Sequence, residues 1–160
     1  MNNLTNNISV GITIKRLRKQ KGWTQKELAE RTQLQRTYIS SIETGEKNIT
    51  ISTLEKILKA FNISFQSYFL LADKEKNNFE GESYLYLEPF NLDDSTYWLG
   101  KKIKFYRLNL NISQEELAYE AGIATSYASK IENGSANLTV NLLYSISSIL
   151  NIHISKLFNH

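Results

Sequence analysis

The hydrophobic positions in the first part of the chain recur at helical spacing. Val10, Ile14 and Leu17 lie at i, i+4 and i+7, the stripe of a helix that packs on one side. Leu54 and Leu58 repeat the i, i+4 spacing further along the chain. The pattern predicts five short helices, near residues 10–21, 25–32, 36–43, 51–61 and 65–70.

Start and stop signals support these boundaries. Thr24 has Glu27 three residues later, which is the capping box that begins a helix. Gly45 follows the helix predicted at 36–43 closely, as a C-terminal stop signal does. Thr50 can cap the next helix through its hydroxyl.

The chain contains an internal repeat at an offset of 89 residues. Gly11–Phe69 aligns with Gly100–Phe158 without a gap, and 20 of the 59 pairs are identical. Chance would give about one identity in twenty, and two copies are too few for a solenoid. The sequence therefore predicts an all-α fold with two tandem five-helix domains, at residues 1–70 and 100–160. The acidic, aromatic segment 71–99 is predicted to be a linker, with a short strand at 84–87 as one interpretation.

Residues 24–45 and 113–134 each follow the plan of a helix-turn-helix, two short helices joined by a tight turn. Both carry the pattern Gln-x-x-Leu-Ala followed by Tyr-x-Ser-x-Ile-Glu-x-Gly. This pattern resembles the Cro/phage-repressor-like family, also called the xenobiotic-response-element type. The stretch Leu-Gln-Arg-Thr-Tyr-Ile-Ser-Ser-Ile-Glu at 34–43 is also similar to the controller proteins of restriction–modification systems.

The resemblance implies that the second helix of each motif lies in the major groove of DNA. Arg36 can offer a guanidinium to guanine, the commonest specific base contact, and Thr37 can touch a thymine methyl group or a phosphate. Gln25 opens the preceding helix, where backbone amides suit a phosphate, and Lys47 follows the recognition helix. The predicted DNA contacts of the first copy are Gln25, Gln35, Arg36, Thr37, Ser41 and Lys47.

The second copy departs from the first at these positions. Thr125 and Ser126 replace the Arg-Thr pair, while Lys130 is gained where the first copy has a serine. Three roles are open for this copy: weak DNA binding, recognition of a different half-site, or a part in assembly. Its predicted contacts are Gln114, Thr125, Ser126 and Lys130. Arg18 with Glu43, and Arg107 with Glu132, are predicted to be structural ion pairs, as in the family.

Charge is distributed unevenly. Residues 12–70 carry 11 basic and 5 acidic side chains, residues 71–99 carry 2 and 7, and residues 100–160 carry 6 and 4. A basic N-terminal half suits a phosphate backbone. The chain has no Cys and two His, and its sequence shows no nucleophile–base pair and no phosphate-binding glycine loop. We therefore expect it not to be an enzyme and to need no cofactor or metal.

The leading interpretation is a sequence-specific transcriptional regulator, a controller or repressor that binds double-stranded operator DNA. An antitoxin-type module that sequesters a partner protein is the alternative. No membrane span or signal peptide is recognisable, so a cytoplasmic location is expected.

Two geometries on DNA are open. The expected one is a homodimer on a palindrome, and the other is a pseudo-dimer of the two copies on an asymmetric site. The candidate interface residues, for which core packing is the other interpretation, are Phe65, Tyr68, Phe69, Leu70, Ile154, Leu157 and Phe158.

Overall fold

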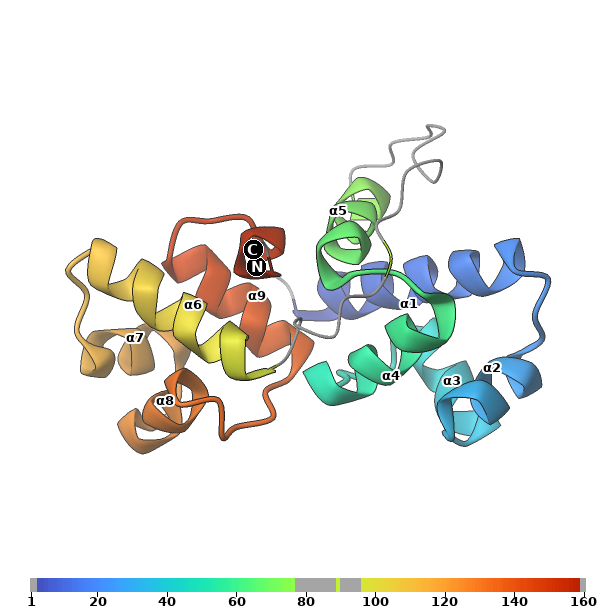
Figure 1. The fold of residues 1–160 in the computed structure, drawn as a ribbon, viewed down its shortest axis with the longest axis horizontal. Coiled ribbons are helices and arrows are strands. Elements are labelled where there is room, and N and C mark those ends of the chain that lie inside the picture. The colour runs from blue at the N-terminus through green and yellow to red at the C-terminus, as the bar shows by residue number, and fades with distance from the viewer. Residues whose placement is uncertain (1–2, 77–88, 90–95, 159–160) are drawn as a thin grey trace.

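The computed structural model describes residues 3–76, 89 and 96–158, and these form nine α-helices and one 3-10 helix (Figure 1). The first copy contains α1 (Asn3–Gln20), α2 (Gln25–Thr32), α3 (Arg36–Glu43), α4 (Ile51–Phe61) and α5 (Phe65–Lys76). The second contains α6 (Thr96–Asn109), α7 (Gln114–Ala121), α8 (Thr125–Glu132), α9 (Val140–Ile149) and the 3-10 helix η1 (Ile154–Phe158). The predicted all-α fold of tandem helical units is confirmed. The strand suggested at 84–87 lies outside the described residues.

Two helices of the first copy are longer than the sequence pattern predicts. Helix α1 begins at Asn3 and α5 continues to Lys76, so residues 71–76 of the expected linker are helical. The extensions pack on each other, because the Ser9 hydroxyl donates to the Ala72 carbonyl. Next to them, the buried Tyr68 hydroxyl donates to the Val10 carbonyl over 3.0 Å. Polar residues line the buried side of the first turns of α1, which hides this part of the helix from a hydrophobicity pattern.

A glycine in each copy sets how closely the first helix approaches the recognition helix. A Cβ atom on Gly11 would lie 2.2 Å from the Ile42 carbonyl oxygen, and one on Gly100 would lie 2.3 Å from that of Ile131. Both distances are far inside van der Waals contact. Glycine at these positions therefore lets α1 cross α3, and α6 cross α8, with backbones touching.

Side-chain caps begin the helices that the sequence signals indicate. Thr24 accepts a hydrogen bond from the Glu27 backbone N–H, and Glu27 accepts one from the Thr24 backbone N–H, which completes the capping box. Hydrogen bonds from the Thr24 backbone and hydroxyl hold the pKa of Glu27 below its ordinary value. Ser113 and Glu116 repeat the arrangement at the start of α7. These local signals are why α2 and α7 begin where the sequence predicts.

Gln33 ends α2 in the left-handed conformation, with φ of 56°, where the second copy has Gly122 at φ of 67°. A left-handed residue with a Cβ atom costs about 1–2 kcal/mol. We expect Gln33→Gly to raise the free energy of unfolding by about 1 kcal/mol and Gly122→Gln to lower it by about as much, measured by urea denaturation. No atom lies within 4 Å of a Cβ built on Gly122, so its substitution reports backbone strain alone. Equal stability of Gln33→Gly and the parent protein would contradict the prediction.

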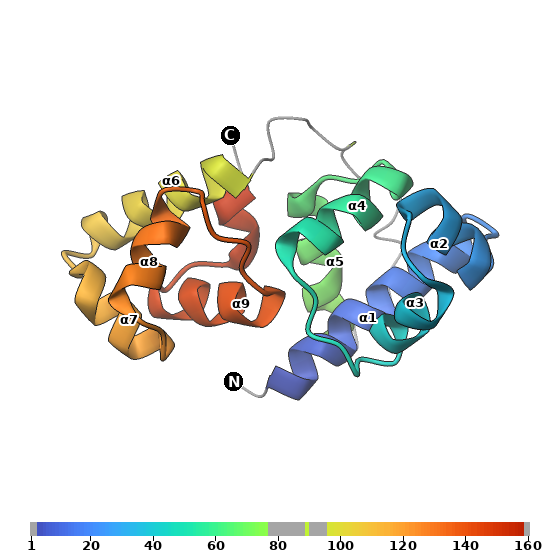
Figure 2. The ribbon, with the colours of Figure 1, turned by 90° about the horizontal axis from the view of Figure 1, so that it is seen from below.

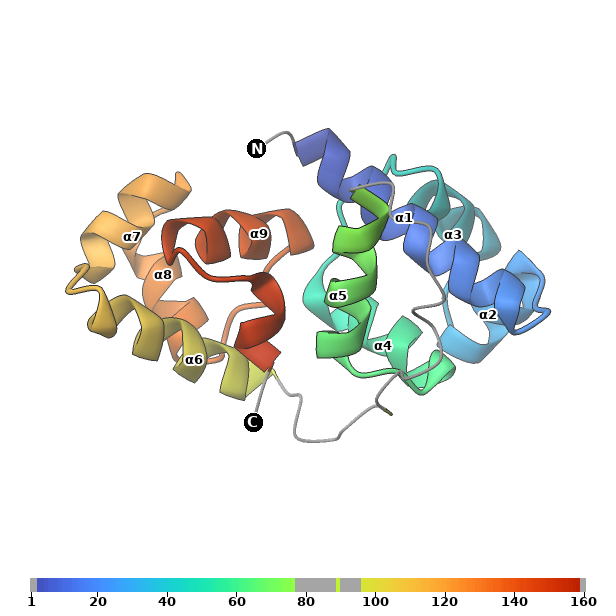
Figure 3. The ribbon, with the colours of Figure 1, turned by 90° about the horizontal axis from the view of Figure 1, so that it is seen from above.

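The two copies pack against each other through α5, α9 and η1 (Figures 2 and 3). Phe65 and Phe69 of α5 stack on Phe158 of η1 at centroid distances of 4.6 and 5.4 Å. Six of the seven candidate interface residues are buried, and only Leu70 is exposed. An aromatic core therefore joins the copies within one chain.

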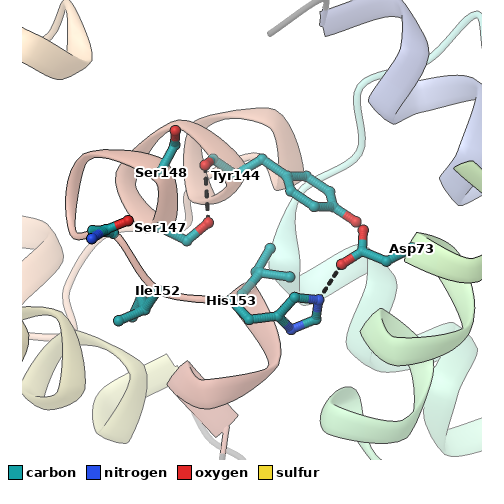
Figure 4. Close-up of a pocket in the computed structure, with 8 residues that line it drawn as sticks. Asp73, Tyr144, Ser147, Ser148, Ile152 and His153 are labelled. Carbon is teal, nitrogen blue, oxygen red and sulfur yellow. Dashed lines mark hydrogen bonds and ion pairs between the residues drawn. The ribbon is translucent and has the colours of Figure 1, made fainter. Parts of the chain in front are cut away.

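Polar groups flank this aromatic contact at the edge of a cavity of about 380 Å³ (Figure 4). Asp73 of α5 pairs with His153, which precedes η1, and the Tyr144 hydroxyl points at the same carboxylate. Burial is the largest cause that raises the pKa of Tyr144 well above its ordinary value. The charge of Asp73 and a hydrogen bond to it raise this pKa further.

None of the helices in the described ranges is long and apolar enough to cross a bilayer.

Candidate nucleic-acid interface

Helices α2 and α3 are held as a unit by their buried faces. Leu28 and Ala29 of α2 pack with Ile39 and Ile42 of α3, and all four are at most 5% exposed. The second copy uses Leu117, Ala118, Ala128 and Ile131 at the equivalent positions. In each copy, these buried residues hold the recognition helix, α3 or α8, against the helix before it.

The N-terminal end of α3 projects polar side chains into solvent. Gln35, Arg36 and Thr37 are exposed, and the Gln35 side chain makes no capping hydrogen bond although it occupies the N-cap position. Ser41 is half-buried, and its hydroxyl donates to the Tyr38 carbonyl over 2.9 Å. The first turn of α3 thus carries the side chains that are free to reach outward, and Ser41 is already engaged by its own helix.

Arg18 and Glu43 form a buried pair beneath the recognition helix. Arg18 Nε donates to Glu43 Oε1 at 2.6 Å and Nη2 donates to Oε2 at 2.9 Å, with side chains 9% and 2% exposed. Arg18 Nη1 also donates to the Trp23 carbonyl over 2.6 Å. The hydrogen bond to Glu43 raises the pKa of Arg18. The guanidinium therefore joins α1, the turn before α2, and the end of α3.

Gln25 connects this pair to the surface. Its Nε2 donates to Glu43 Oε2 over 3.0 Å, and the side chain is half-buried at the first position of α2. Glu43 therefore accepts one of the two amide hydrogens of Gln25. The motif pattern placed Gln25 beside DNA but gave no sign of this hydrogen bond.

The second copy reproduces the same framework. Arg107 Nε and Nη2 donate to Glu132 at 2.6 and 3.0 Å, and Arg107 Nη1 donates to the Ile112 carbonyl over 2.7 Å. Gln114 Nε2 donates to Glu132 Oε2 over 3.0 Å. The scaffold under the two recognition helices is therefore the same.

The outer surfaces of the two recognition helices differ. Thr125, Ser126 and Lys130 of α8 are exposed, and the N-cap position holds Ala124 without a side-chain cap. Lys47, in the loop after α3, is exposed as well. Its counterpart in the second copy is Ala136, which is buried.

The charge on the two motifs differs too. Residues 25–43 carry three basic and three acidic side chains, whereas residues 114–132 carry one basic and four acidic side chains. The first copy is therefore better suited to approach a phosphate backbone by itself.

The fold and these two surfaces define a tandem helix-turn-helix protein. The helix-turn-helix family matches residues 14–67 and 103–157, and the chain belongs to this family. The family membership predicted from the motifs is confirmed.

The chain is also similar to three named proteins. The chain is 37% identical over 70 residues to the competence pilus inhibition repressor of Acinetobacter baylyi, covering 44% of this chain and 64% of that protein, less than two thirds of its length. It is 39% identical over 69 residues to the control protein C.MunI of a Mycoplasma species, covering 42% of this chain and 93% of that protein. The solved restriction-modification controller protein C.AhdI of Aeromonas hydrophila is 27% identical, with a TM-score of 0.38, covering 39% of this chain and 96% of that one.

Proposed function

We propose that this protein is a sequence-specific DNA-binding transcriptional regulator, a controller or repressor without enzymatic activity. Its first copy reads operator DNA through α3. The main support is that Arg36 and Thr37 are exposed on the first turn of α3. The inner face of this helix is buried, and its C-terminal end is held by the ion pair with Arg18. An α-helix held in this way fits the major groove, with its N-terminal residues at the base edges.

Supporting contacts come from around the recognition helix. Gln25 has an amide hydrogen for a phosphate at the start of α2, and Lys47 is an exposed cation just beyond α3. Gln35 extends the reading surface at the N-cap. Ser41 is assigned a lesser role, because its hydroxyl is bonded to the Tyr38 carbonyl.

No contact or surface among the described residues favours the antitoxin alternative. Binding of a partner protein therefore stays a prediction. The expected homodimer also stays a prediction. The aromatic residues considered for it, such as Phe69 and Phe158, are used between the two copies of one chain.

Arg36→Ala is expected to weaken binding to the selected operator by about 1–3 kcal/mol and to relax the preference at one base position. The guanidinium supplies a two-pronged contact that alanine cannot replace. The measurement is equilibrium binding to an operator selected from a random pool and to each of its single-base variants.

Lys47→Ala is the matched control for this substitution. A phosphate contact carries no base identity, so this variant should weaken binding to all sequences about equally and flatten the dependence on salt. If Arg36→Ala left every base preference unchanged, α3 would not be the reader proposed here.

A further inference from the structure

The contact between the two copies is reciprocal, as in a twofold-symmetric dimer. The Ile51 backbone N–H donates to the Leu138 carbonyl, and the Val140 N–H donates to the Ile49 carbonyl, both over 2.9 Å. The second bond joins the counterparts of the residues in the first, because Val140 corresponds to Ile51 and Leu138 to Ile49 at the offset of 89. The two bonds flank an antiparallel bridge between Thr50 and Thr139. In a symmetric dimer, residue i contacts j and j contacts i in the same way. Here both halves of the relation are made by one chain.

Side chains repeat this reciprocity. Asn137 Oδ1 accepts from the Ser52 N–H over 3.2 Å, and its counterpart Asn48 Oδ1 accepts from the Asn141 N–H over 3.3 Å. The asparagine amides therefore lock the starts of α4 and α9 to each other from both sides.

The aromatic core fixes the copies a second time, away from this bridge. Phe69 is fully buried and stacks on Phe158, which is its own counterpart in the repeat. Phe69 also meets Tyr144 of α9 edge-on, with centroids 5.8 Å apart. Two separate contacts hold the copies at one relative orientation.

This orientation places both recognition helices on one side of the molecule. Figure 1 shows α3 and α8 on the lower side, and Figure 2, seen from below, shows both toward the viewer. A duplex lying along this side would meet α3 and α8 together.

We propose that one chain, as a built-in pseudo-dimer, binds both half-sites of a non-palindromic operator. Helix α3 enters one major groove, and α8 enters the next on the same face of the duplex, about one helical turn or ~34 Å along. This inference rests on the proposed function, and it assigns the second copy a half-site of different sequence.

The half-sites differ because the reading surfaces do. Arg36 at the start of α3 can donate two hydrogen bonds to a guanine. Thr125 at the start of α8 has no guanidinium and suits a thymine methyl group or a phosphate. We expect the acidic second motif to bind DNA weakly by itself, because its charge repels phosphates. The link to the first copy nevertheless holds it at high effective concentration once α3 is bound. The proposed contacts of this second half-site are Gln114, Thr125, Ser126 and Lys130.

The test starts from an operator selected by the parent protein. Three duplexes are compared: the selected sequence, a palindrome of its α3 half-site and a palindrome of its α8 half-site. We expect the selected sequence to bind about tenfold more tightly than either palindrome, since each palindrome gives one motif an unsuitable half-site. The mass of the complex, measured by sedimentation, should correspond to one chain per duplex.

A second test exchanges exposed residues of the second copy for those of the first, so that the core and the folding of the protein are left unchanged. The variant Ala124→Gln, Thr125→Arg, Ser126→Thr and Lys130→Ser gives α8 the outer residues of α3, and all four positions are exposed. It should prefer the α3 palindrome about tenfold over the selected operator. Leu108→Gln, at an exposed position of α6, is the control and should keep the parent preference.

The possible outcomes separate this inference from the proposed function. Two chains per operator, or a parent protein that binds the α3 palindrome as tightly as the selected sequence, would overturn the pseudo-dimer while leaving α3 as the reader. An exchange variant with unchanged preference would likewise remove α8 from base reading. A random pool that yields no preferred duplex would overturn the proposed function itself.

Discussion

Replacing Glu43 with Gln is expected to lower the free energy of unfolding by about 3–5 kcal/mol. The substitution keeps the side-chain volume but removes the carboxylate that accepts two hydrogen bonds from Arg18 and one from Gln25. It leaves the Arg18 charge buried with a neutral partner, and such a charge is costly in a poorly solvated site. Urea unfolding followed by circular dichroism measures the loss.

Glu30→Gln is the matched control, because it removes the same charge from a surface pair. Glu30 and Lys26 are 65% and 78% exposed and lie 3.9 Å apart within α2. Such a pair contributes about 0.3–0.5 kcal/mol. Exchange of both Arg18 and Glu43 for Met should recover much of the lost stability, since no unpaired charge then remains. If Glu43→Gln were as mild as Glu30→Gln, the pair would not hold α1 to α3.

Phe69→Ala should cost about 3–5 kcal/mol of unfolding free energy, because it empties the centre of the contact between the copies. The ring is fully buried and packs on rings from both copies. The neighbouring Leu70→Ala is the control: Leu70 is 45% exposed, and a surface change of this kind costs about 0.5 kcal/mol or less.

A second variant tests whether the loss belongs to the contact between the copies. Phe158→Ala should cause a similar loss, and the double variant should lose less than the sum, because both substitutions remove the same stacked pair. Additive losses, or a Phe69→Ala variant as stable as Leu70→Ala, would mean that the copies are not held together by this core.

The sequence was sufficient for the features that depend on local signals. The capping residue Thr24 predicted where α2 begins, because a cap acts within three residues of itself. The repeat and its motif pattern predicted two helix-turn-helix units. The contact of Arg36 with DNA, which the family resemblance implies, stays a prediction.

Other features needed the tertiary structure, because distant residues decide them. The start of α1 at Asn3 depends on α5, which offers the Ala72 carbonyl to Ser9 across 63 positions. The hydrogen bond of Gln25 to Glu43 joins residues 18 positions apart, and no motif records it.

The relation between the copies shows the difference most clearly. Asn48 and Asn137 are identical in the repeat, which is the signal that sequence comparison offered, and it does not say what they bind. Their reciprocal hydrogen bonds cross 93 and 85 positions and form only when both copies are folded. Burial of Phe69 and Phe158 could mean a core or a dimer interface, since both remove aromatic surface from water equally well. The sequence therefore determined two helix-turn-helix units, and the tertiary structure alone decided that they face each other within one chain.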